Sequence, residues 1–378
     1  MQIETKFVHG GKSYESKTGA ISTPIYQTAT FKHLGVNQST GYDYSRTQNP
    51  TREKLEKTYA LLESGDAGMA FATGMAAVAT IIELFSAGDH LLVCDDIYGG
   101  SYRFFDSLAT QKSLQFSYVS MDNIEEVEAA LQANTKAIFF ETPTNPMMKV
   151  TDIRQICEFA KAKGILAIVD NTFLTPYLQR PLELGADIVI SSATKFLAGH
   201  NDTLCGLVAA KGKELVERLC FIQNTIGSVC SPFDSWLVLR GIKTLAVRMR
   251  TQEENTKKLF NWLRAHPLIS KVYYPGDKEH PCYPISCKQA SGHGSMISFE
   301  TKTEALAKKI LEKVEIISFA ESLGGVESLI TYPVLQTHAD IPGETLAKLG
   351  INHRLLRLSV GIEAAEDLLA DLSQAIAE

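Results

Sequence analysis

The chain has 378 residues, of which 45% are hydrophobic and 21% are charged, and its formal net charge is −6. These are ordinary values for a folded globular protein, so they exclude a disordered or fibrous chain. The length predicts two domains. Nucleic-acid-binding proteins usually carry a basic stripe, and none is visible here, so a nucleic-acid partner is not expected.

The sequence shows no signal for export or for insertion into a membrane. Its first six residues lack the apolar run of a signal peptide, and no stretch approaches the ~20 apolar residues of a membrane span. The seven cysteines are odd in number and scattered, often within apolar runs, which is typical of reduced, buried thiols. We therefore expect a cytoplasmic protein without a membrane partner.

Two of these cysteines, Cys282 and Cys287, lie near His280 and His293 in the sequence. Cysteine and histidine are the usual ligands of zinc, so this segment is a candidate for a metal site. The spacing matches no zinc pattern, and no metal is expected.

The first 55 residues are rich in Thr, Ser, Gly and Tyr, which predicts an extended arm. From residue 56 to residue 235, short apolar runs alternate with helical patterns. Strands are expected at 91–93, 137–140, 165–169 and 188–190, and helices at 75–85, 124–131 and 153–163. Continuous apolar strands separated by helices indicate a mainly parallel sheet that is covered on both faces.

After residue 235 the strict alternation ends. One long helix is expected at 235–266, strands at 272–274, 295–299 and 356–360, and helices at 304–314 and 364–377. Such an order favours a smaller α+β domain. The predicted fold class is therefore α/β, with an arm (residues 1–55), a large domain with a mainly parallel sheet (56–235) and a C-terminal α+β domain (236–378).

Two of the expected strands lead into residues that suit one cofactor. The strand at 165–169 is followed by Asp170, and the strand at 188–190 leads through Ser192 and Thr194 to Lys195. Ligands of open α/β sheets bind beyond the carboxyl ends of the strands. Pyridoxal phosphate (PLP) needs a lysine amine for its Schiff base and a carboxylate that faces its ring nitrogen. Taken singly, a polar strand end or a lysine is ordinary, but together Asp170 and Lys195 predict a PLP site.

A seat for the cofactor phosphate is expected where Gly74 and Met75 open a helical pattern, because N–H groups at a helix start attract phosphate. Gly74 can equally be a flexible start of a helix. Tyr98 is a candidate for stacking on the cofactor ring, with a buried core tyrosine as the alternative. The glycine fingerprint of dinucleotide sites is missing, which argues against a nicotinamide enzyme.

Longer motifs follow one another along nearly the whole chain. They are Tyr44-Ser45-Arg46, Asn49-Pro50-Thr51-Arg52, Thr73-Gly74-Met75-Ala76-Ala77, Tyr98-Gly99-Gly100, Glu141-Thr142-Pro143-Thr144-Asn145-Pro146, Asp170-Asn171-Thr172-Phe173, Ser192-Ala193-Thr194-Lys195 and Ser322-Leu323-Gly324-Gly325-Val326-Glu327-Ser328. This set resembles the transsulfuration enzymes of the Cys/Met metabolism family, which includes cystathionine γ-synthase, the cystathionine β- and γ-lyases and methionine γ-lyase. The resemblance implies a fold type I PLP enzyme, usually a homotetramer of two tight dimers.

The resemblance also implies roles for single residues. Lys195 is then the Schiff-base lysine and proton shuttle, Asp170 the partner of the ring nitrogen, and Tyr98 the stacking tyrosine that assists proton transfer. The other implied cofactor contacts are Gly74, Met75, Ser192 and Thr194 at the phosphate, Tyr44 and Arg46 reaching the phosphate from a neighbouring subunit, and Asn145 at the ring. The implied substrate contacts are Arg357 at the α-carboxylate, Arg103 at a distal carboxylate, Ser322 and Glu327.

Some positions bear on the reaction. Ser191, Phe196 and Asn201 depart from the commoner family pattern, which leaves specificity open. Gly100 stands where methionine γ-lyases typically have a reactive cysteine, which argues against that activity. The motifs around His200 and 232–236 are most similar to bacterial γ-synthases. We therefore expect γ-replacement of O-acylhomoserine by cysteine, with cystathionine β- or γ-lyase activity as the alternative.

A PLP-binding regulator without catalysis is the hypothesis from another class. It is disfavoured because both Lys195 and Asp170 are present. Small sulfur amino acids or an O-acylhomoserine are therefore the expected substrates.

Overall fold

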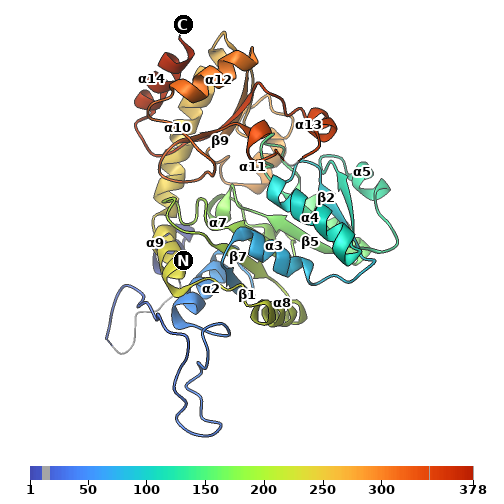
Figure 1. Cartoon of the computed structure of the whole chain (residues 1–378), viewed down its shortest axis with the longest axis vertical. Coiled ribbons are helices and arrows are strands. Elements are labelled where there is room, and N and C mark those ends of the chain that lie inside the picture. Colours follow the sequence, from blue (N-terminus) through green and yellow to red (C-terminus); the bar gives the residue numbers. More distant parts are fainter. Residues whose placement is uncertain (11–17, 340, 378) are drawn as a thin grey trace.

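The computed structural model describes residues 1–10, 18–339 and 341–377, and it places two sheets one above the other with helices around them (Figure 1). The larger sheet occupies the lower half of the view, and the C-terminal strands and helices lie above it. Residues 18–49 run mostly as an extended arm away from the body.

The larger sheet has seven strands, and all but β7 run in the same direction. In spatial order they are β1 (Ala67–Phe71), β7 (Gly206–Ala210), β6 (Ile188–Ser192), β5 (Leu166–Asp170), β4 (Thr135–Glu141), β2 (His90–Cys94) and β3 (Gln115–Val119). Strand β7 is antiparallel to both of its neighbours. The prediction of a large, mainly parallel sheet is confirmed.

Helices cover both faces of this sheet. They are α1 (Ile3–His9), α2 (Pro50–Glu63), α3 (Gly74–Ile82), α4 (Gly99–Lys112), α5 (Ile124–Ala129), α6 (Ile153–Lys163), α7 (Thr175–Leu178), the 3₁₀ helix η1 (Pro181–Leu184) and α8 (Lys213–Ile226). Consecutive strand residues point to opposite faces, and on β6 Ser191 bonds to Tyr59 of α2 whereas Ser192 lies against Gly74 of α3. Helices α2 and α3 therefore lie on opposite faces.

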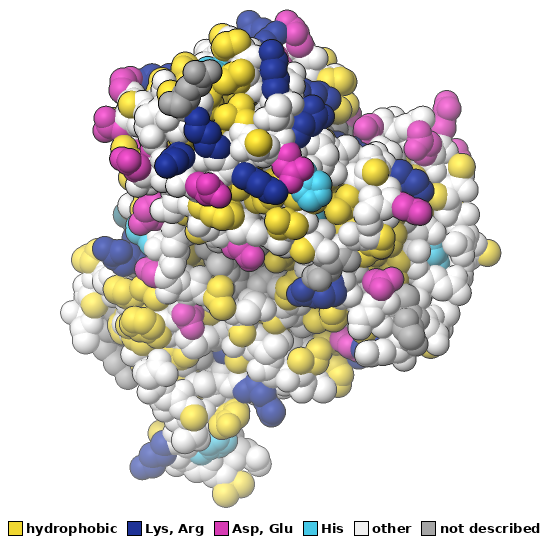
Figure 2. Space-filling model, turned by 45° about the horizontal axis from the view of Figure 1, so that its top comes forward, with side chains coloured by type: hydrophobic (Ala, Val, Ile, Leu, Met, Phe, Trp, Pro, Cys, Tyr) yellow, Lys and Arg dark blue, Asp and Glu magenta, His cyan; other side chains and the backbone are white. Residues whose placement is uncertain are grey.

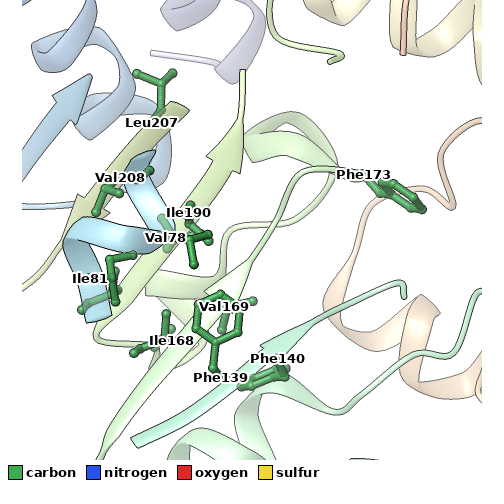
Figure 3. Packing of buried hydrophobic residues seen from close by; sticks show 14 of the residues in the cluster. Val78, Ile81, Phe139, Phe140, Ile168, Val169, Phe173, Ile190, Leu207 and Val208 are labelled. Atoms are coloured by element: carbon green, nitrogen blue, oxygen red, sulfur yellow. The ribbon is translucent and has the colours of Figure 1, made fainter. Parts of the chain in front are cut away.

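The core between α3 and the sheet is built from branched and aromatic side chains. Val78 and Ile81 of α3 point at Ile190 and Val208 of the central strands, and Phe139 of β4 extends the same layer (Figure 3). The strands β2, β6 and β7 are almost fully buried, as continuous apolar runs predict for a covered parallel sheet.

The C-terminal part forms a second, five-stranded sheet with its own core. Its strands, in spatial order, are β10 (Ser318–Phe319), β11 (Leu329–Thr331), β12 (Leu355–Ser359), β9 (Met296–Thr301) and β8 (Ile269–Tyr273). The remaining helices are α9 (Pro232–Ile242), α10 (Leu245–Ala265), α11 (Tyr283–Gln289), α12 (Glu304–Lys313), η2 (Pro333–Leu335), α13 (Gly343–Leu349) and α14 (Ala365–Ile376). Pairing is antiparallel except between β10 and β11, so the predicted smaller α+β part is confirmed. The domain limits at residues 55 and 235 stay a prediction.

One predicted element is wrong in form. The single helix expected at 235–266 is two helices, α9 and α10, which are separated at Lys243 and Thr244. The guanidinium of Arg248 on α10 donates hydrogen bonds to the carbonyls of Gly241 (2.8 Å) and Phe196 (2.7 Å). A buried cation therefore satisfies the end of α9 and also fixes the chain that follows Lys195.

The surface carries both signs of charge. On the face shown in Figure 2, basic and acidic side chains are interspersed rather than gathered into large patches of one sign. No helix among the described residues combines the length and the apolar character needed to cross a membrane. The described part of the chain also contains no group of three or more His, Cys, Asp or Glu side chains suited to a metal ion.

Candidate active site

A pocket of about 230 Å³ lies at the carboxyl ends of β4, β5 and β6. Glu141 ends β4, Asp170 ends β5 and Ser192 ends β6, and all three line the pocket. Since β5 pairs with β6, Asp170 and the lysine that follows β6 lie at the ends of neighbouring strands. Lys195 and Arg357 are the only cationic side chains among the described residues that line it.

Lys195 is held at the pocket by the turn after β6 and by the C-terminal part. Its Nζ donates a hydrogen bond to Ser322 Oγ at 2.7 Å. Burial, followed by the charge of Arg357, lowers the pKa of Lys195 to about 8. A lysine with such a pKa gives up its proton near neutral pH, so it suits both nucleophilic attack and proton transfer.

Asp170 is a half-buried carboxyl at the pocket wall, and Thr172 orients it. Both the backbone N–H of Thr172 (2.9 Å) and its hydroxyl (2.6 Å) donate to Asp170 Oδ1. Burial raises the pKa of Asp170 to about 6, although the hydrogen bonds from Thr172 act in the opposite direction. No basic side chain in the described part of the chain forms an ion pair with it, so a cationic group of a ligand would stabilise its charged form.

The first turn of α3 forms an anion seat beside Ser192. Thr73 caps this helix, because its hydroxyl accepts from the Ala76 N–H at 3.0 Å. The amides of Gly74 and Met75 belong to the helical turn whose N–H groups have no partner within a helix, and both residues line the pocket. A Cβ on Gly74 would approach Ser192 to 3.2 Å, so glycine keeps this cradle open.

Tyr98 begins α4 and is held by a buried carboxylate. Its backbone N–H donates to Glu141 Oε2 at 3.1 Å, and the N–H of Asn145 donates to Glu141 Oε1 at 2.8 Å. A Cβ on Gly100 would lie 2.5 Å from the Tyr98 ring, so glycine is needed for the ring to lie over the helix start. The ring remains 42% exposed at the pocket.

Arg357 on β12 is fully buried, and most of its donors are taken. Nη1 donates to Asn145 Oδ1 at 2.8 Å, and Nη2 donates to the Ser322 carbonyl (2.8 Å) and to Thr331 Oγ1 (3.0 Å). Nε is buried and has no partner among the described residues. A buried unpaired donor is costly, so Arg357 is prepared for an acceptor such as a substrate carboxylate.

The chain matches, over residues 4–377, the family model described as Cys/Met metabolism PLP-dependent enzyme. The chain belongs to this family. It is 50% identical to a cystathionine β-lyase of Lactococcus lactis subsp. cremoris over 99% of this chain and 98% of the relative. It is 48% identical to a cystathionine γ-synthase of Haemophilus influenzae, again over 99% and 98%. A solved cystathionine γ-lyase of Lactobacillus plantarum, complexed with L-serine, superimposes with a TM-score of 0.97 at 47% identity, over 99% and 98% of the two chains.

The chain is therefore a PLP-dependent transsulfuration enzyme, and the fold type I architecture expected from its motifs is confirmed. The residues of the pocket fit the cofactor. The uncompensated carboxyl of Asp170 suits the protonated ring nitrogen, the open cradle at Gly74 and Ser192 suits the phosphate, and Lys195 suits the aldehyde. Bound PLP would withdraw electrons from the α-carbon of an amino acid.

Four of the residues expected at the site are not among those that line the pocket of this single chain. Tyr44 and Arg46 lie exposed on the arm, with the Arg46 guanidinium 5.8 Å from the centre of the Tyr44 ring. Arg103 is exposed on α4. Glu327 accepts a hydrogen bond from Asn201 at 2.8 Å. Arg103 and Glu327 are therefore outside the pocket that this single chain forms, and their contact with substrate stays a prediction.

Sequence reasoning missed three residues that the structure brings to the pocket. Glu141, Thr172 and Glu321 line it. The first two are members of longer motifs, and Glu321 directly precedes the motif that begins at Ser322. Glu141 and Thr172 follow buried strands, which is a usable signal. Glu321 lies on the loop after β10 and carried no such signal, because its distance from Lys195 depends on how the two sheets pack.

A buried carboxyl also lies behind the site. Glu63 of α2 is fully buried, and burial raises its pKa to about 8. Its Oε1 accepts from Asn171 Nδ2 at 3.2 Å and from the Tyr59 hydroxyl at 3.3 Å, whereas Oε2 has no partner among the described residues. Tyr59 in turn bonds to Ser191 at 2.9 Å. Glu63 is therefore protonated at neutral pH in the folded protein.

Replacing Glu63 with Gln is expected to remove a pH dependence of stability. The pKa of Glu63 is higher in the folded than in the unfolded chain. Its contribution to the free energy of unfolding is therefore present at low pH and is lost as pH rises from about 4.5 to about 8. Between these limits the free energy of unfolding of Glu63→Gln should gain ~2–5 kcal/mol relative to the wild type. Urea denaturation at several pH values measures this difference.

The exposed Glu128, which pairs with Lys163, supplies the matched control. Glu128→Gln should change stability by less than about 1 kcal/mol at every pH. A constant difference between Glu63→Gln and the wild type across this pH range would contradict a protonated Glu63.

Proposed function

We propose that this enzyme acts on cystathionine and that its main reaction is cleavage of the C–S bond, with release of a thiol amino acid, a keto acid and ammonia. The observation that carries the proposal is the presence of two opposite charges, Arg357 and Glu321, in one pocket. Both charges act on Lys195: Arg357 lowers its pKa and Glu321 raises it. Both charges are therefore close enough to the reactive amine to affect its protonation.

Cystathionine matches these charges because it carries an amino-acid group at each end. The α-carboxylate of the reacting end fits the free Nε of Arg357. The ammonium of the distal end fits the carboxylate of Glu321, which is exposed at the pocket wall. A substrate with one amino-acid end would leave one of the two charges unused.

Different residues of the chain bind the cofactor, orient the substrate and transfer the proton. Asp170 and the α3 start hold the cofactor, and Arg357 with Asn145 orients the amino acid. Lys195, with its lowered pKa, removes the α-proton and can return it to the departing thiolate. Ser322 links the two functions, because its hydroxyl accepts from Lys195 and its carbonyl accepts from Arg357.

The γ-replacement expected from the sequence is the second candidate. Its support is that Glu321 suits the ammonium of an incoming cysteine as well as that of cystathionine. In addition, 48% identical relatives of H. influenzae and Bacillus subtilis are named γ-synthase. The exposed position of Arg103 weakens it, since that residue was the expected contact for a distal carboxylate. Relatives named lyase include the 50% identical protein of L. lactis and the 49% identical γ-lyase of Bacillus subtilis.

Two parallel assays on the purified enzyme test the proposal. One supplies cystathionine alone and follows keto acid release, with pyruvate reporting β-cleavage and 2-oxobutyrate γ-cleavage. The other supplies O-acetyl- or O-succinylhomoserine with cysteine and follows cystathionine. Fast keto acid release with slow synthesis is the expected result, and the reverse would make the enzyme a synthase.

Replacing Glu321 with Gln is expected to raise KM for cystathionine about tenfold or more, because a charge-assisted hydrogen bond to the distal ammonium is lost. An amino acid with a short neutral side chain has no distal ammonium, so its KM should stay within about twofold. Steady-state kinetics with both substrates measures the contrast.

Glu327 is the control for this prediction, because its carboxylate bonds to Asn201 and does not line the pocket. Glu327→Gln should leave KM for cystathionine within about twofold. A larger effect at Glu327 than at Glu321 would favour the assignment made from the sequence.

We also propose that a second copy of the chain supplies Tyr44 and Arg46 to the phosphate seat. The segment that bears them is rigid, because the buried guanidinium of Arg52 donates to the carbonyls of Ser45 (2.5 Å), Arg46 (3.2 Å) and Thr47 (3.0 Å). Its exposed apolar neighbours Leu34 and Val36 suit burial against another subunit.

Mixing inactive variants tests this sharing. Arg46→Ala and Lys195→Ala should each be impaired alone, but hybrid oligomers contain one site with both residues intact. Refolding the two together should restore up to about a quarter of wild-type activity per site in a symmetric dimer with random pairing. No recovery, despite oligomers of wild-type size in sedimentation, would place Arg46 in its own chain's site or outside the site.

A further inference from the structure

A second hollow lies in the C-terminal part, between α10, α11 and the segment 274–279. It measures about 750 Å³, which is within the range of small-molecule sites. None of the residues that line it lines the active-site pocket. We call it the α10–α11 groove.

The groove contains a thiol with a base beside it. Cys287 on α11 is exposed, and its Sγ lies 4.0 Å from His293 Nε2. The other ring nitrogen of His293, Nδ1, lies 2.9 Å from the hydroxyl of Ser286, which is buried. A nucleophile, a base and a third group that orients the base are the parts of a nucleophilic site.

Aromatic rings hold the imidazole in place. The ring centre of His293 lies 5.4 Å from that of Tyr283 and 6.3 Å from that of Tyr274. Partial burial lowers the pKa of His293, so the ring is neutral near neutral pH and can accept a proton. A side-chain hydrogen bond with Cys287 raises the pKa of Tyr283, which places the phenol at the thiol as well.

We propose that Cys287 undergoes thiol–disulfide exchange with small disulfides of thiol amino acids, with His293 as the base. The thiol gives its proton to His293 Nε2, Sγ bonds to one sulfur of the disulfide, and the S–S bond of the disulfide breaks. The departing thiolate takes the proton from His293 and leaves as a free thiol. The disulfide is therefore the oxidant, and a mixed disulfide remains on Cys287.

The ligand class follows from what the groove offers. Exchange at a disulfide develops no oxyanion, so a thiolate, a base and room are sufficient, whereas acyl transfer would need oxyanion donors as well. Both signs of charge line the groove: Lys257 pairs with Glu253 at 2.8 Å, and Arg264 pairs with Asp277 at 2.8 Å. Such a lining suits the ammonium and carboxylate groups of a zwitterionic disulfide.

Cys220 provides an internal comparison, because its thiol is also exposed but no histidine lies within hydrogen-bond range of it among the described residues. The PLP-loaded enzyme is incubated with L-cystine, and the two cysteines are followed by peptide mass spectrometry. Cys287 should gain a cysteinyl group at least about tenfold faster than Cys220. Equal rates, or faster reaction at Cys220, would overturn the proposal.

Two variants test whether Cys287 reacts because His293 acts as its base or only because it is exposed. His293→Gln should slow modification of Cys287 about tenfold or more and leave Cys220 unchanged. Ser286→Ala keeps the imidazole and should slow Cys287 by a smaller factor, about threefold. The visible band of bound PLP shows that each variant is folded. If Cys287 were modified at the wild-type rate in folded His293→Gln, His293 would not be the base.

A neutral disulfide of similar size, bis(2-hydroxyethyl) disulfide, tests the ligand class. The ratio of the Cys287 rate to the Cys220 rate should be at least about fivefold higher with L-cystine than with this probe. Equal ratios would overturn the assignment to zwitterionic disulfides. L-Cystine also carries an amino-acid group at each end, so the same rates are measured in Lys195→Ala, in which turnover is lost. The ratio of the Cys287 rate to the Cys220 rate should be the same in both proteins, which separates modification of Cys287 from the reaction proposed for the active site.

Discussion

The Lys195→Ala variant is expected to lose turnover by about 10⁴-fold or more and still bind PLP. The variant lacks the amine that bonds to the cofactor and moves the substrate proton. The cofactor seat is made by other residues: Asp170, Ser192 and the first turn of α3 stay in place. Turnover and retention of PLP after dialysis are the two measurements, and each reports a different part of the site.

Ser322→Ala is the matched control, because it removes the hydrogen-bond partner of Lys195 Nζ and keeps the amine. Loss of one hydrogen bond is worth about 1 kcal/mol, so activity should fall no more than about tenfold. Wild-type turnover in Lys195→Ala would contradict the assigned role. Loss of PLP on dialysis together with loss of turnover would mean that the cradle alone does not hold the cofactor.

The central strands of the large sheet could be predicted because their signal lies within short segments of the sequence. Strands such as β2 and β6 are covered on both faces, so they appear in the sequence as continuous apolar runs. Helix α6 was also predicted with its observed bounds, since Asp152 caps its start and Gly164 ends it. Strands β1 and β7 were not predicted. Alanine and glycine dominate their sequences, because α2 and α3 pack closely against them, and these small residues do not form the apolar runs that mark the other strands.

The division of the expected helix at 235–266 depended on a contact that no periodicity reveals. Both halves have helical spacing, but Arg248 reaches the Gly241 carbonyl and the chain after Lys195 at the same time. The break is therefore stabilised by tertiary hydrogen bonds. Sequence patterns report which face of an element is apolar and do not report such long-range bonds.

Some residues of the candidate site could be predicted from the sequence, and others could not. Lys195 and Asp170 follow buried parallel strands, so their placement at one edge of the sheet follows from topology. Glu321 and Glu327 lie only six residues apart, and spacing alone does not decide which of them faces the pocket. Ser322 between them has a positive φ (87°), and in the folded chain Glu321 lines the pocket whereas Glu327 bonds to Asn201.

Arg357→Ala is expected to raise KM for the amino-acid substrate by about 100-fold, because a charge-assisted hydrogen bond to the α-carboxylate and the buried positive charge are both lost. The fall in kcat should be smaller, since Lys195 and Asp170 remain in place. Arg357→Lys should recover only part of the affinity, because a lysine keeps the charge and lacks the planar fork. Steady-state kinetics of the three proteins separates charge from geometry.

Thr331→Val controls for damage to the scaffold. Thr331 Oγ1 accepts from Nη2 of Arg357 at 3.0 Å, so this variant removes a bond that holds the guanidinium and leaves the unpaired Nε free for substrate. Its KM should rise only about threefold to tenfold. If Thr331→Val were as impaired as Arg357→Ala, orientation of the guanidinium would dominate binding. If Arg357→Ala kept the wild-type KM while remaining folded, the carboxylate would bind elsewhere.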